Sequence, residues 1–79
     1  MPKLRKRDGK WDRMRETLEG RRAVLGLTYE EIAAKMNVSR CTVATRFRNP
    51  EQFTLNELLI LAIVFDVSLS YVLSAAPER

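Results

Sequence analysis

Apolar residues recur at helical spacing along this 79-residue chain, and no strand-like alternation of apolar and polar residues is visible. The first helical pattern begins near Trp11. Met14, Leu18 and Leu25 then fall on one helix face, with arginine and glutamate residues between them. Gly26 predicts the end of this helix, because glycine adopts the left-handed conformation that often terminates helices. The pattern therefore predicts an all-α protein.

The segment 28–47 predicts two short helices around a tight turn. Thr28 and Glu31 fit a capping box at the start of the first of them. Asn37 stands where the chain must leave that helix, and asparagine tolerates the left-handed conformation well. Ser39 is a suitable N-cap for the second helix. The inner faces of the two helices are predicted to consist of Ile32, Ala33, Met36, Val43 and Phe47.

A fourth helix is predicted to follow a loop at 49–52, because Pro50 disfavours helical conformation in the residue before it. Thr54 and Glu57 form a second capping box, and the helix runs from there to about residues 65–66. This fourth helix is apolar almost all round, which predicts that it is buried.

The chain is predicted to consist of one domain with a short extension at each end. Ser68 caps a short fifth helix, and we expect the chain to fray from Ala75. The predicted boundaries are a basic flexible arm at 1–10, a compact five-helix bundle at 11–76 and a frayed tail at 77–79.

The positive charge is unevenly distributed. The net charge is +4, residues 1–10 alone carry +4, and the segment 32–50 has four basic residues and no acidic one. The segment 51–79 sums to −3. A protein that meets a polyanion with one face has such a distribution, and so does an ordinary solvated surface.

Composition excludes several kinds of site. Cys41 is the only cysteine and histidine is absent, so an internal disulfide, an ordinary zinc site and histidine-based catalysis are all excluded. The longest apolar run, 58–65, is too short to span a membrane. No nucleophile–base pair is evident. We therefore expect a cytoplasmic protein that is not an enzyme, with no cofactor, no membrane partner and no small-molecule ligand.

Three stretches together carry a resemblance: LTYEEIAAKMNVSRCTV, TLNELLILA and DVSLSYVL. They resemble the phage-repressor and Cro-like (XRE-type) helix-turn-helix DNA-binding family over about residues 14–74. The resemblance implies a five-helix domain of the lambda-repressor-like type, with the helix-turn-helix at 28–47. It also implies a transcription regulator that binds double-stranded DNA as a homodimer on a near-palindromic operator.

The resemblance also implies roles for individual residues. Those at base-reading positions are Arg40, Cys41 and Thr45. Those at positions where phosphate contacts are common are Tyr29, Ser39, Thr42, Arg46, Arg48 and Asn49. Arg22 joins the second group, because Phe47 stands where the family often has a glutamate that pairs with the matching arginine. We therefore expect Arg22 to be free to meet DNA.

Several of these roles have alternatives. Arginine pairs in bidentate fashion with guanine, so Arg40 is the leading specificity residue, and a phosphate contact is its alternative. Thr45 contacts a base or is merely exposed. Cys41 contacts a thymine methyl group, is an inert small residue, or is a redox-sensitive thiol. The basic arm enters the minor groove or only keeps the protein in solution.

The fourth helix raises the question of a second subunit. The hypothesis is a symmetric dimer contact, and the alternative is burial within one protomer. The residues predicted for the contact are Ile60, Ile63, Val64, Leu69 and Val72. The same apolar surface also suits a second function, a protein-interaction module such as an antitoxin subunit or adaptor.

Overall fold

The computed structural model describes residues 9–77, and every regular element within that range is helical. The elements are α1 (Asp12–Leu25), α2 (Tyr29–Met36), α3 (Arg40–Arg48), the 3₁₀ helix η1 (Pro50–Gln52), α4 (Leu55–Phe65) and α5 (Leu69–Ser74). The predicted all-α five-helix bundle is confirmed. None of the helices in the described range is long and apolar enough to cross a membrane. Most of the predicted arm and tail lies outside the described residues.

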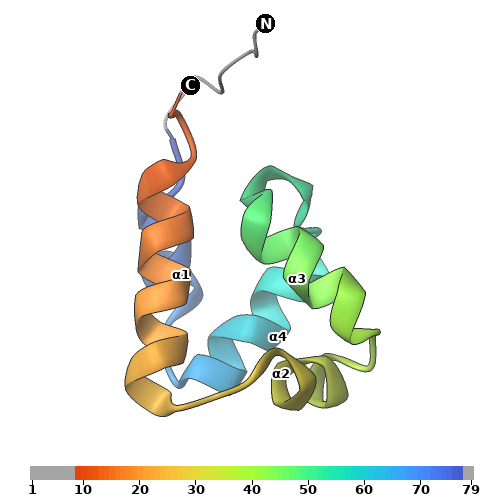
Figure 1. The fold of residues 1–79 in the computed structure, drawn as a ribbon. Helices are drawn as coiled ribbons and strands as arrows, with labels where there is room; N and C mark the ends of the chain where they lie inside the picture. The colour runs from red at the N-terminus through yellow and green to blue at the C-terminus, as the bar shows by residue number, and fades with distance from the viewer. Residues whose placement is uncertain (1–8, 78–79) are drawn as a thin grey trace, which may run out of the picture.

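The helices form two groups joined by α4 (Figure 1). α1 and α5 lie side by side and run in opposite directions, whereas α2 and α3 lie on the other side of the molecule. α4 contacts α1, α2 and α5, so it connects the two groups. This arrangement leaves one side of α3 without a covering helix.

The helix ends are as the sequence predicts. Gly26 and Asn37 end α1 and α2 in the left-handed conformation, with φ of 69° and 59°. Thr28 and Thr54 each form a complete capping box, with Glu31 and Glu57 respectively. The hydroxyls of the two predicted serine caps also accept a helix amide. These caps satisfy amides that the first turn of a helix leaves without partners.

The core is built around Phe47 of α3. Its ring contacts those of Tyr29, Phe53 and Phe65, with centroid distances of 5.3, 6.0 and 6.5 Å. Burial of a large aromatic side chain is among the strongest single contributions to the stability of a small domain. The other buried core residues are Met14, Leu18, Ile32, Ala33, Met36, Val43, Leu58, Leu61, Ala62, Phe65, Val72 and Ala75.

Helix α1 is held in place by polar contacts in addition to its short apolar face. The Arg15 Nε donates to the carbonyl of Arg48, the last residue of α3, at 3.0 Å. Arg21 donates through Nε and Nη2 to the carbonyl of Phe65, the last residue of α4, at 3.3 and 3.2 Å. The carbonyls at a helix C-terminus lack partners within the helix, and the helix dipole favours a cation there. α1 therefore ties down the ends of two other helices.

Three expectations about the fold are wrong. Leu25 is 41% exposed, because the inner face of α1 ends before its last turn. Residues 50–52 form a 3₁₀ turn, because the carbonyls of Asn49 and Pro50 accept hydrogen bonds from residues three positions on. Ala75 is only 4% exposed, so the chain does not fray there; it continues the packing of α5.

Candidate nucleic-acid interface

The turn between α2 and α3 sets the direction of the second helix. The Ser39 Oγ accepts a hydrogen bond from the Thr42 amide at 3.0 Å and lies 2.9 Å from the Thr42 hydroxyl. Val43 and Phe47 then bury the inner side of α3. The two hydroxyls therefore contact each other at the start of α3, the helix that the family resemblance implies is the DNA-contacting one.

The outer face of α3, defined here as Arg40, Cys41, Thr45 and Arg48, is polar and carries no acidic residue. Arg40, Cys41 and Arg48 are exposed, and Thr45 is half-buried. Neither arginine side chain makes a hydrogen bond or ion pair with another described residue, and the thiol is free. A helix with unpaired guanidinium groups on its open side is suited to contacts with bases and phosphates.

Arg46 does not belong to this outer face. Its guanidinium lies against the Glu57 carboxylate, with Nε 3.0 Å from one oxygen and Nη2 3.5 Å from the other. Burial alone raises the pKa of Glu57, but the Thr54 amide and the Arg46 guanidinium donate to the carboxylate and together lower its pKa. Arg46 joins α3 to α4 and is less available for a phosphate than the sequence suggests.

Arg22 is not free, which corrects the expectation from the sequence. Its Nε donates to Glu19 at 2.8 Å and its Nη1 donates to the Leu27 carbonyl at 2.8 Å. The guanidinium also lies over the ring of Tyr29, 4.9 Å from its centroid. Glu19 supplies from α1 the partner that the resemblance places at the position of Phe47.

The Tyr29 hydroxyl is also engaged, because it donates to the second oxygen of the Glu19 carboxylate. Burial of the ring and, to a smaller extent, this hydrogen bond raise the pKa of Tyr29, so the hydroxyl keeps its proton. Its ring packs on Phe47. Tyr29 therefore has a structural role in joining α1, α2 and α3.

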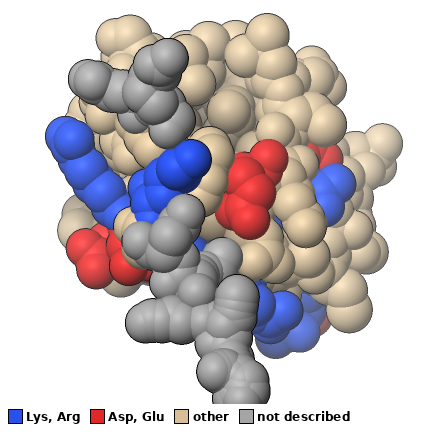
Figure 2. All heavy atoms as spheres, turned by 90° about the horizontal axis from the view of Figure 1, so that it is seen from above, with Lys and Arg blue, Asp and Glu red and all other residues tan. Residues whose placement is uncertain are grey.

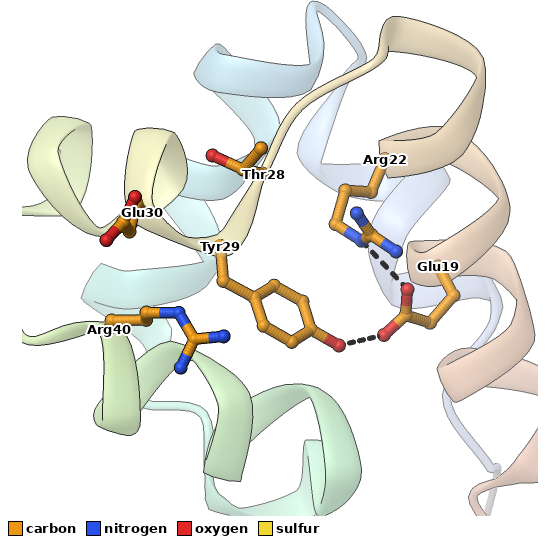
Figure 3. Close-up of a pocket in the computed structure, with 6 residues that line it drawn as sticks. All are labelled: Glu19, Arg22, Thr28, Tyr29, Glu30 and Arg40. Carbon is orange, nitrogen blue, oxygen red and sulfur yellow. Dashed lines mark hydrogen bonds and ion pairs between the residues drawn. The ribbon is translucent and has the colours of Figure 1, made fainter.

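A pocket opens to solvent beside this group (Figure 3). It lies between the α1 helix and the first residues of α2 and α3, and the Arg40 side chain extends along it toward Tyr29. The residues that line it are Glu19, Arg22, Thr28, Tyr29, Glu30 and Arg40. The pocket brings Arg22, which is paired with Glu19, together with Arg40 and Glu30.

Asn49 lies at the C-terminal end of α3, where its amide donates to the Thr45 carbonyl at 2.8 Å. It is half-buried.

Figure 2, which views the molecule from above Figure 1, shows blue and red side chains intermixed beside a broad uncharged area.

A comparison with protein families supports the assignment of this geometry. A family model described as helix-turn-helix matches residues 21–72, well over half of the chain. The chain belongs to the XRE-type helix-turn-helix family. The family consists of DNA-binding regulators, so this protein is in general terms a DNA-binding transcription regulator. Comparisons with curated proteins and with solved structures find no match.

This helix-turn-helix protein also has an apolar stripe on α4, defined here as Leu55, Leu59 and Ile63. They are 63%, 42% and 78% exposed and stand four residues apart, so they lie on adjacent turns of one side of the helix. Burial within one protomer, the alternative to a dimer contact, is therefore wrong for this side of α4.

The residues predicted for a dimer contact divide into three groups. Ile63 is largely exposed, whereas Ile60, Val64 and Leu69 are partly buried against the core. Val72 is fully buried on the inner side of α5 and cannot contact a second subunit, which corrects that part of the prediction. It packs inward together with Leu69, which lies three residues earlier on the same helix and is partly buried against the core.

Glu19 belongs to the site but was not among the residues predicted for it from the sequence. Its spacing from Arg22, three residues on one helix, is typical of an ion pair and was the available signal. The contact with Tyr29 comes from another helix and carries no such local signal.

Proposed function

We propose that this helix-turn-helix protein is a sequence-specific regulator that binds a near-palindromic operator as a homodimer, in the manner of a small phage-type repressor. The observation that supports this most directly is the exposed guanidinium of Arg40 at the start of α3, which has no hydrogen-bond or ion-pair partner among residues 9–77. The rest of that helix carries no acid that would repel DNA.

In this proposal α3 lies in the major groove and Arg40 pairs with a guanine. Cys41 and Thr45 contact neighbouring bases. Arg48 and Asn49 at the end of the helix contact phosphates. Ser39, Thr42 and Arg46 have internal partners and contribute less. Bound at an operator, the protein excludes polymerase from the promoter.

We propose that the second protomer packs against the α4 stripe. Ile63 lies at the centre of this contact between protomers, and Ile60, Val64 and Leu69 lie at its edge. Ile63 is 78% exposed, and an apolar patch of this kind on a small protein is typical of an interaction surface. A two-fold axis through such a contact would present two copies of α3 to successive turns of the major groove.

Selection of bound DNA from a random pool tests the proposal. The expected result is an enriched palindrome whose half-sites lie about one helical turn, ~34 Å, apart. A pool that enriches no sequence, at a salt concentration where the protein is folded, contradicts sequence-specific binding.

The alternative proposal is a protein-interaction module on the same scaffold. The same exposed stripe on α4 is what favours it. A mobility-shift assay at defined salt with excess non-specific competitor DNA separates the two, because a regulator retains its selected site and an interaction module does not.

A further inference from the structure

The carboxylate of Glu19 accepts hydrogen bonds from two side chains, Arg22 and Tyr29, that line the pocket between α1, α2 and α3. One oxygen accepts from the Arg22 Nε at 2.8 Å, and the other accepts from the Tyr29 hydroxyl. Proteins hold a DNA phosphate with the same donors, a guanidinium and a hydroxyl that converge on one oxyanion. Glu19 therefore fills a donor set that also suits a phosphate.

The position of the pocket places these donors beside the outer face of α3. Arg40, the first residue of α3, lines the same pocket, and its side chain extends toward the Tyr29 ring (Figure 3). A duplex held by Arg40 therefore brings its backbone close to the group that Glu19 occupies. This step rests on the proposed function, in which α3 is the DNA-contacting helix.

Arg22 has further contacts that do not involve Glu19. Its Nη1 donates to the Leu27 carbonyl at 2.8 Å, and its guanidinium lies over the Tyr29 ring. The Tyr29 ring is in turn packed on Phe47. Removal of the carboxylate charge therefore frees donors that still point into the pocket.

We propose that Glu19 is an internal substitute for a DNA phosphate. In the free protein it occupies Arg22 and Tyr29, and a backbone phosphate replaces it when α3 binds DNA. Because the phosphate must first displace Glu19, the phosphate contact contributes less free energy to DNA binding. Glu19 therefore limits both the affinity of the protein for DNA and the salt dependence of that affinity.

The Glu19→Gln variant tests the proposal. Glutamine keeps the size of the side chain and an oxygen for the Tyr29 hydroxyl, but it removes the charge that competes with phosphate. The dissociation constant of a selected duplex is measured at several salt concentrations for wild type and variant. We expect the variant to bind roughly tenfold more tightly, as for one added charge-assisted hydrogen bond. The slope of log K against log salt should steepen by about 0.9.

Glu30→Gln is the matched control, because Glu30 lines the same pocket and has no hydrogen bond to Arg22 or Tyr29 among the described residues. It removes one negative charge without releasing a donor. An equal gain from both variants would overturn the proposal, since the effect would then be one of net charge. Weaker or unchanged binding by a folded Glu19→Gln variant would also overturn it, because that result indicates a purely structural role.

A second measurement uses the wild-type protein and does not depend on the stability of a variant. The Arg22 and Arg21 Nε–H resonances are followed by NMR during titration with the duplex. Exchange of carboxylate for phosphate should shift the Arg22 resonance, whereas Arg21, bound to the Phe65 carbonyl, should stay unchanged. An unshifted Arg22 in a saturated complex contradicts the exchange. If the wild type binds no duplex at all, the proposed function fails and this inference fails with it.

Discussion

α3 and α4 are adjacent helices of similar length, yet their outer sides differ in chemistry. α3 buries Val43 and Phe47 and exposes Arg40 and Arg48, whose side chains have no hydrogen-bond or ion-pair partner within the described part of the chain. α4 buries four apolar residues and exposes three more, with Ile63 the most exposed. Both helices have a fixed inner face, and the difference lies wholly on the outer side. A basic outer side is suited to a polyanion, and an apolar one is suited to another protein surface.

The largest effect should come from Phe47 on the inner side of α3. Phe47→Ala removes a ring that contacts three other aromatic rings, and it should cost about 3–5 kcal/mol in the free energy of unfolding. Urea unfolding followed by circular dichroism measures it. Val24→Ala, on the exposed side of α1 and outside the proposed dimer contact, is the control and should change that free energy by about 0.5 kcal/mol or less. Equal losses would contradict a core centred on Phe47.

Ile63→Lys should disrupt the proposed dimer without unfolding the protomer. A lysine at the centre of the contact must be desolvated, so the dimer dissociation constant should rise at least about tenfold, or ~1.4 kcal/mol. Analytical ultracentrifugation measures the change. Ala34→Lys, which adds the same charge to an exposed position on α2, should leave the dimer intact. A wild-type protein that stays monomeric at high concentration would refute the contact.

The two N-caps should separate the roles of the helices. Ser39→Ala and Thr54→Ala each remove a hydroxyl that accepts a helix amide, and each should cost about 1 kcal/mol of unfolding free energy. Only Ser39→Ala should also weaken DNA binding, because Ser39 begins the DNA-contacting helix. Thermal melts combined with binding isotherms test this. Equal losses of DNA affinity in the two variants would contradict a DNA-contacting role that belongs to α3 and not to α4.

The smallest effect concerns the ion pair between Arg46 and Glu57, which joins the two helices. The pKa of Glu57 is lowered in the folded protein from its ordinary value of 4.5. The stabilisation is therefore fully present above about pH 4.5 and is lost as the pH falls through the folded pKa. Unfolding free energies between pH 6 and about pH 3 should fall more steeply for wild type than for Glu57→Gln. Parallel curves would contradict the assignment.

Local features of the fold were predictable from the sequence, because their causes lie within a few residues. The capping boxes at Thr28 and Thr54 and the left-handed turn at Asn37 depend on neighbouring side chains and backbone. Burial of Phe47 followed from its spacing to Val43.

Features that depend on contacts between helices were not predictable in the same way. Arg22 is held by Glu19 and stacks on Tyr29, which belongs to another helix. Val72 and Ala75 are buried because α5 packs along α1, and no sequence pattern in so short a helix specifies that side. The outer face of α3 was predicted in large part, except that Arg46 turns to Glu57 of α4.

The proposed recognition of DNA sequence by α3 through Arg40 is tested most directly by the Arg40→Ala variant. Binding to the selected operator and to the same operator with one guanine–cytosine pair replaced is measured at fixed salt, beside Lys35→Ala as a control for lost charge. We predict that Arg40→Ala loses about 1–3 kcal/mol on the operator and no longer distinguishes the two duplexes, whereas Lys35→Ala still does. Full discrimination by the Arg40→Ala variant at every guanine of the operator would contradict base recognition by Arg40.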